Sequence, residues 1–146
     1  MNYLQRAVEL SRASFYAGEF PAGAVLVTKK RRVYESDPSL AWYHGECMVI
    51  DKAIEAEGAP LNGAAMYASM ESCLMCSAKM YWADVTKVYF VIPKDKTNTQ
   101  YAYEDDKPMQ EHISSFHTAL EKVQDSTMID EALSLYSDWV KKIEGK

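Results

Sequence analysis

Three residues that can bind a metal ion constrain this fold more than any other feature, because they lie in two separate parts of the chain. Cys73 and Cys76 are three positions apart, so at the start of a helix both thiols can point at one ion. The helix N-terminus also favours thiolate over thiol. His44 has to come from the start of another helix, across an intervening strand. The sequence therefore predicts two helix N-termini that converge on one cation.

Apolar patterns along the chain predict helices that alternate with strands. The helices are expected at about residues 3–18, 44–57 and 73–83. The strands are expected at residues 21–27, 33–35, 64–69 and 87–92. Such alternation is typical of an α/β layer fold. We expect a single domain over residues 1–146.

The C-terminal part of the chain is expected to be helical. Residues 93–110 are polar and turn-like. Beyond them, four apolar residues fit the spacing of a helix: Ile113, Phe116, Leu120 and Val123. A last helix is expected from about residue 126 to residue 143. The sequence therefore predicts a C-terminal helical extension at about residues 108–146.

Charge and cysteine content restrict the classes of partner and compartment. The net charge is −5, so the chain as a whole is not an obvious binder of polyanions. Three cysteines, an odd number, without a secretory signal favour a reducing compartment. No stretch reaches the roughly 18 apolar residues that a membrane span needs. We expect a cytoplasmic protein without membrane association.

The ligand spacing alone leaves three interpretations open. If His44, Cys73 and Cys76 bind zinc, a fourth position stays free for water, and Glu46 can move the protons of that water. Cys47 lies three residues after His44, so a closed Cys₃His cage in a non-catalytic, zinc-stabilised binding domain is the second interpretation. In the third, no metal binds and the cysteines are small core residues.

The flanking sequence resembles the cytidine/deoxycytidylate deaminase superfamily. Three segments carry the resemblance in order: Pro21–Val27, His44–Glu46 and Tyr67–Cys76. Tyr67–Ser69 and Tyr81–Ala83 are more similar to the bacterial guanine deaminase branch than to the tRNA adenosine deaminases. The resemblance implies a three-layer α/β/α cytidine deaminase-like fold with a central mixed sheet, the zinc helices on one face, and a homodimer.

Carried onto this chain, the resemblance makes His44, Cys73 and Cys76 the ligands of Zn²⁺ and Glu46 the proton shuttle. Cys47 then becomes a small buried side chain. The implied reaction is guanine deaminase-like: hydrolytic deamination of a nucleobase or similar small aminated heterocycle, with release of ammonia.

Departures from the family pattern leave the substrate open. Gly45 replaces the usual Ala, and Ser72 replaces the usual Pro before the first cysteine. The Asn that many relatives place between the first strand and the His is missing. This absence and the acidic balance disfavour tRNA as substrate, so a tRNA adenosine deaminase and a deaminase of cytosine nucleosides or nucleotides stay as alternatives. The candidate substrate contacts are Phe20, Gly45, Trp82 and Asp105.

Overall fold

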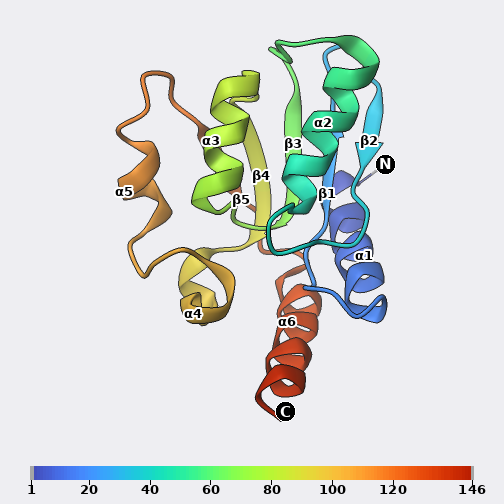
Figure 1. Ribbon diagram of the computed structural model, residues 1–146, viewed down its shortest axis with the longest axis vertical. Helices are drawn as coiled ribbons and strands as arrows, with labels where there is room; N and C mark the ends of the chain where they lie inside the picture. Colours follow the sequence, from blue (N-terminus) through green and yellow to red (C-terminus); the bar gives the residue numbers. More distant parts are fainter. Residues whose placement is uncertain (1, 146) are drawn as a thin grey trace.

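The computed structural model describes residues 2–145 and contains one five-stranded sheet between two layers of helices (Figure 1). The order across the sheet is β2-β1-β3-β4-β5. The strands are β1 (Ala24–Val27), β2 (Val33–Glu35), β3 (Ala65–Met70), β4 (Lys87–Ile92) and β5 (Glu121–Gln124). β1 runs antiparallel to β2 and β3, whereas β3, β4 and β5 are parallel. The predicted mixed sheet is confirmed.

Helices cover both faces of the sheet. α2 (Gly45–Glu57) and α3 (Leu74–Ala83) pack on one face, and α1 (Tyr3–Tyr16) and α6 (Ile129–Glu144) pack on the other. Successive side chains of a strand point to opposite faces. Met66 of β3 accordingly joins the core under α2 and α3, and its neighbour Tyr67 joins the core under α1 and α6. The two helices that carry the candidate ligands therefore share one face, as predicted.

Between β4 and β5 the chain forms three short helical segments rather than a plain loop. They are η1 (Lys94–Lys96), α4 (Thr99–Ala102) and α5 (Met109–Ile113). Of the helices described within residues 2–145, none has the length and apolar character that crossing a lipid bilayer requires.

The predicted helix through Ile113 and Val123 is wrong. α5 ends at Ile113, and residues 121–124 form β5, which pairs in parallel with β4. Ile113 and Leu120 are buried as expected, but they pack with Met109 in a small separate cluster. Without β5, the edge of β4 would have unpaired backbone N–H and C=O groups, and residues 121–124 pair with them. The helix-like spacing of four apolar residues contains no information about this pairing. Residues 121–124 therefore complete the sheet, and they lie along the chain between the helices α5 and α6.

Candidate functional site

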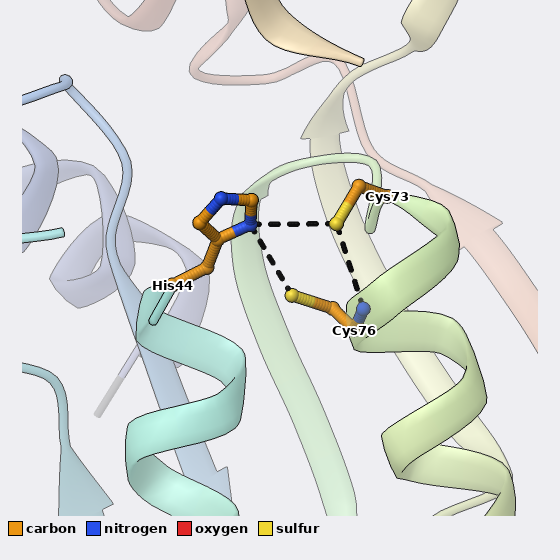
Figure 2. A group of neighbouring side chains, drawn as sticks. All are labelled: His44, Cys73 and Cys76. Carbon is orange, nitrogen blue, oxygen red and sulfur yellow. Dashed lines mark hydrogen bonds between the residues drawn. The ribbon is translucent and has the colours of Figure 1, made fainter. Parts of the chain in front are cut away.

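The two helix N-termini bring the candidate metal ligands together, as Figure 2 shows. His44 is the N-cap of α2 and Cys73 is the N-cap of α3. Nδ1 of His44 lies 3.4 Å from Sγ of Cys73 and 3.4 Å from Sγ of Cys76. All three ligand atoms lie within 4.8 Å of one another. Tetrahedral zinc with ordinary bond lengths separates its nitrogen and sulfur ligands by about 3.6 Å, so this donor set fits zinc.

The His44 ring is held in the orientation that a metal ligand needs. Its Nε2 lies 2.9 Å from the carbonyl oxygen of Ala41, to which it can donate a hydrogen bond. With Nε2 donating to Ala41, the ring can give up its Nδ1 proton when a metal ion binds, and the lone pair of Nδ1 then faces Cys73 and Cys76. Metal-binding histidines commonly use such a second hydrogen bond to fix the ring and its tautomer.

The thiol of Cys73 is prepared for metal binding. Before a metal ion binds, hydrogen bonds to Cys76 and His44 lower the pKa of Cys73 to about 5. The hydrogen bond to Cys73 in turn raises the pKa of His44 to about 9. These contacts favour the thiolate form of Cys73, which is the form that coordinates metals.

Cys47 lies beside this site but outside the ligand group. Its Sγ is 3.6 Å from Sγ of Cys76, and its side chain is buried. Within residues 2–145, however, the set of mutually close ligand atoms comprises His44, Cys73 and Cys76 without Cys47. The geometry therefore supports an open three-ligand site over the closed Cys₃His cage.

Cys47→Ala is expected to bind one zinc ion per chain, as the wild type does, because Cys47 is a neighbour of a ligand rather than a ligand. The loss of a buried thiol should lower the free energy of unfolding by about 1 kcal/mol, a typical value for a single substitution. Metal analysis of the purified variant measures the first effect, and denaturant unfolding measures the second. In a closed cage this variant would instead lose both its metal and its fold.

Glu46 is a buried carboxyl group in the first turn of α2, two residues after His44. Burial raises the pKa of Glu46 to about 7, and the negative charge of Cys73 adds to this effect. A carboxyl group with this pKa can both accept and release a proton near neutral pH. Glu46 thus has the properties of a general acid and base.

His44, Glu46 and Cys73 all line one cavity of about 470 Å³. Aromatic side chains form much of its remaining wall: Phe20, Tyr101, Tyr103 and Trp139. The rings of Phe20 and Trp139 meet edge to face, with centroids 4.6 Å apart. The volume lies in the range of small-molecule sites, and the aromatic wall suits a planar ligand.

Of the four predicted substrate contacts, the structure places only Phe20 in the wall of this cavity. Gly45 instead packs against Ser36, whose side-chain atoms would lie 3.0 Å from an added Cβ. Trp82 is 82% exposed on α3 and does not line the cavity. These two expectations are corrected: close packing explains Gly45, and Trp82 faces solvent.

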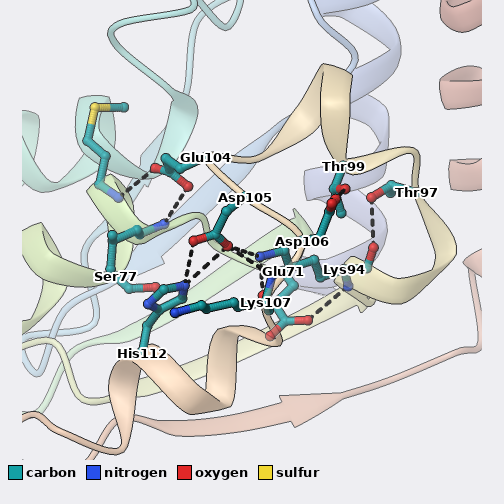
Figure 3. A network of polar contacts seen from close by, with 12 residues as sticks. Glu71, Ser77, Lys94, Thr97, Thr99, Glu104, Asp105, Asp106, Lys107 and His112 are labelled. Carbon is teal, nitrogen blue, oxygen red and sulfur yellow. Dashed lines mark hydrogen bonds and ion pairs between the residues drawn. The ribbon is translucent and has the colours of Figure 1, made fainter.

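Asp105 is also not part of the cavity wall. Its carboxylate lies 3.2 Å from Nζ of Lys94 and 3.2 Å from Nε2 of His112, so it joins a polar network shown in Figure 3. Its neighbour Glu104 lines the cavity instead. Of the acidic residues 104–106, Glu104 therefore lies in the cavity wall, whereas the predicted contact Asp105 lies outside it.

Glu104 also joins the cavity wall to the metal-binding helix. Its two carboxylate oxygens accept hydrogen bonds from the backbone N–H groups of Leu74 and Met75, each at 3.2 Å (Figure 3). The hydroxyl group of Tyr103 donates a second hydrogen bond, to the carbonyl oxygen of Glu71 at 2.7 Å. The start of α3 is therefore held by the segment that forms the wall.

Sequence reasoning did not assign Tyr101, Tyr103 or Trp139 to the site. The two tyrosines stand out in the sequence, because they are aromatic residues within the otherwise polar segment 93–110. This contrast could have marked them as residues of the site. Trp139 lies on α6, far along the chain, and nothing in the local sequence points it at the cavity.

Comparison with known proteins gives one family match and several relatives. The sequence model of the cytidine and deoxycytidylate deaminase zinc-binding region matches residues 1–92. The tRNA-specific adenosine deaminase of Bacillus subtilis (strain 168) is 34% identical over 96 residues, which are 60% of this chain and 58% of that protein. The guanine deaminase of the same organism is 30% identical over 131 residues, which are 79% of this chain and 82% of that protein.

A solved structure from a study of A-to-I editing by tRNA:A34 deaminases is 25% identical in sequence, with a TM-score of 0.70. That match covers 91% of this chain and 97% of the solved one. The chain spans about three fifths of the length of the tRNA-specific adenosine deaminases that it matches first.

Proposed function

The chain belongs to the cytidine and deoxycytidylate deaminase family, and from this premise we propose that it is a zinc-dependent hydrolase of aminated heterocycles. The reaction consumes one water, replaces an amino group on a ring carbon with oxygen, and releases ammonia. The observation that carries the proposal is the meeting of His44, Cys73 and Cys76 beside the buried Glu46, at one cavity.

His44, Cys73 and Cys76 would hold the zinc ion, which when bound supplies a Lewis acid that lowers the pKa of a water molecule. Glu46 takes a proton from the attacking water and delivers it to a ring nitrogen of the substrate. A second transfer through Glu46 to the amino group lets ammonia leave. Burial raises the pKa of Glu46 above the ordinary value of a carboxyl group, which favours its return to the protonated form between the two transfers.

The charge of the cavity supports a neutral heterocycle as substrate. Four carboxyl groups line it: Glu19, Glu46, Glu71 and Glu104. Among its lining residues, all within the described part of the chain, there is no lysine or arginine. Carboxylates accept hydrogen bonds from amino and ring N–H groups but repel phosphate. A free base or a nucleoside is therefore favoured over a nucleotide, with Phe20 and Trp139 placed to contact its flat face.

Deamination of adenosine in tRNA is the second candidate. The 34% identity to a tRNA-specific adenosine deaminase supports it directly, and the comparisons do not favour guanine deaminase over that enzyme. The relatives therefore do not support the prediction, made from net charge and the missing Asn, that tRNA is disfavoured as a substrate. A homodimer and a cytoplasmic location stay predictions.

The proposal is tested by measuring ammonia release from a panel of substrates by the zinc-loaded protein. The panel holds guanine, adenine, cytosine, their nucleosides and nucleotides, triazines, and a tRNA anticodon stem-loop. We expect turnover of a free base or nucleoside and little turnover of nucleotides. Turnover of the stem-loop alone would replace this proposal with the second candidate, and no turnover of any substrate would contradict both.

Trp139→Ala is expected to raise KM about tenfold and to change kcat much less. Stacking of an aromatic side chain on a base contributes about 1–3 kcal/mol of binding, and the indole of Trp139 transfers no proton in the proposed reaction. Steady-state kinetics on the best substrate of the panel measures both constants. Trp82→Ala is the matched control, because this tryptophan is exposed outside the cavity. Equal KM values for the two variants would contradict the assignment.

A further inference from the structure

Lys122 is a buried lysine to which the proposed reaction gives no role. It lies on β5, opposite Val88 of β4, and its side chain is only 6% exposed. A buried ammonium group is costly unless it is paired and hydrogen-bonded, so its partners indicate why it is there.

Within residues 2–145, the polar partners of Lys122 lie in the segment from Glu71 to Ser77, which carries the two cysteine ligands. Its Nζ donates to the carbonyl oxygen of Ser72 at 3.5 Å and to Oγ of Ser77 at 3.4 Å. It lies 3.8 Å from a carboxylate oxygen of Glu71. Ser72 directly precedes the ligand Cys73, and Ser77 directly follows the ligand Cys76. The lysine therefore contacts the chain on both sides of the ligand pair.

The two serines are also connected to each other. Oγ of Ser72 lies 2.9 Å from Oγ of Ser77, and both residues are fully buried. A proline at position 72, the residue expected from the family pattern, would fix the backbone φ angle at the entry to α3. Ser72 lacks that constraint, and its contacts with Ser77 and Lys122 supply another.

We propose that Lys122 is a positioning residue for the metal site, which fixes the turn from Glu71 to Ser77 so that Cys73 and Cys76 both face the ion. The inference rests on the zinc site of the proposed function. The proposal gives β5 a role in that site, because this strand carries Lys122. In the sequence, Lys122 is far from His44, Cys73 and Cys76. Residues that orient metal ligands in this way typically change metal affinity by about 10- to 100-fold when they are replaced.

The test compares Lys122→Met with Lys87→Met, which removes an exposed lysine from the neighbouring strand. Competition with a chromophoric chelator at constant pH gives the zinc Kd of each folded protein. We expect Kd to rise about 10- to 100-fold for Lys122→Met and to stay at the wild-type value for Lys87→Met. The charge-transfer absorption of the cobalt-substituted protein should weaken or shift in the first variant alone, because it reports the thiolate geometry.

If Lys122→Met does not fold, two milder variants test the proposed positioning role of Lys122. Lys122→Gln keeps a hydrogen-bond donor without the charge, and Ser77→Ala keeps the lysine but removes one of its partners. Each should raise the zinc Kd by a smaller factor. If Lys122 only stabilised the fold, its replacement would lower the melting temperature of the metal-free protein and leave the zinc Kd unchanged. That result would overturn the proposal. Absence of ammonia release by the wild type would contradict the proposed reaction alone, since zinc affinity is measured without substrate.

Discussion

Glu46→Gln is expected to bind zinc as the wild type does and to release ammonia about 100- to 10,000-fold more slowly. The amide keeps the size of this buried side chain but cannot take a proton from water. Because Glu46 lies outside the ligand group, its replacement leaves His44, Cys73 and Cys76 in place. Metal analysis and an ammonia assay on the same preparation measure both properties.

Glu55→Gln is the control for this variant. Glu55 is an exposed residue on the same helix, so its replacement makes the same chemical change away from the cavity. It should leave turnover and zinc content unaffected. Undiminished ammonia release by Glu46→Gln would remove Glu46 from the proposed mechanism.

Cys73→Ser is expected to lose zinc binding, and with it the stabilisation that zinc gives the folded protein. At a free zinc concentration 100 times Kd, binding adds about 2.7 kcal/mol to the stability of the wild type. For a domain of this size this corresponds to a rise in melting temperature of roughly 5–10 °C. Calorimetry with and without added zinc should show this rise in the wild type and not in the variant.

The Cys47→Ala variant described above is the matched control, because Cys47 is also a buried cysteine at this site. It should keep the zinc-dependent rise in melting temperature. Treatment with a chelator should abolish ammonia release by the wild type and by Cys47→Ala, and added zinc should restore it in both. Recovery of activity by Cys73→Ser under the same conditions would contradict the ligand assignment.

The helices and strands that hold the metal ligands could be predicted from the sequence because their signals are local. His44 and Cys73 each open a helix, and the apolar strand over residues 65–70 separates them. Ligand spacing did not distinguish Cys47 from a fourth ligand. The distances among the ligand atoms do, because Cys47 is close to Cys76 but not to the whole group.

The wall of the cavity could not be predicted, because it is assembled from distant segments. Phe20, Tyr101 and Trp139 come together only after α6 packs across β4, and no periodicity encodes that packing. β5 was missed for a related reason. Its residues are mostly exposed, so they lack the alternation of apolar and polar positions that marks a half-buried strand, and their pairing partner lies some thirty residues earlier in the chain.

The hydrogen bonds from Leu74 and Met75 to Glu104 have a consequence for how the specificity of this protein can change. The segment around Glu104 lines the proposed substrate cavity, and it also holds the first turn of the helix that carries two metal ligands. Selection for a new substrate through this segment therefore acts on metal retention at the same time. Variants that broaden specificity should be found more readily at Phe20 or Trp139, where a side chain can be exchanged without disturbing the backbone N–H groups of α3.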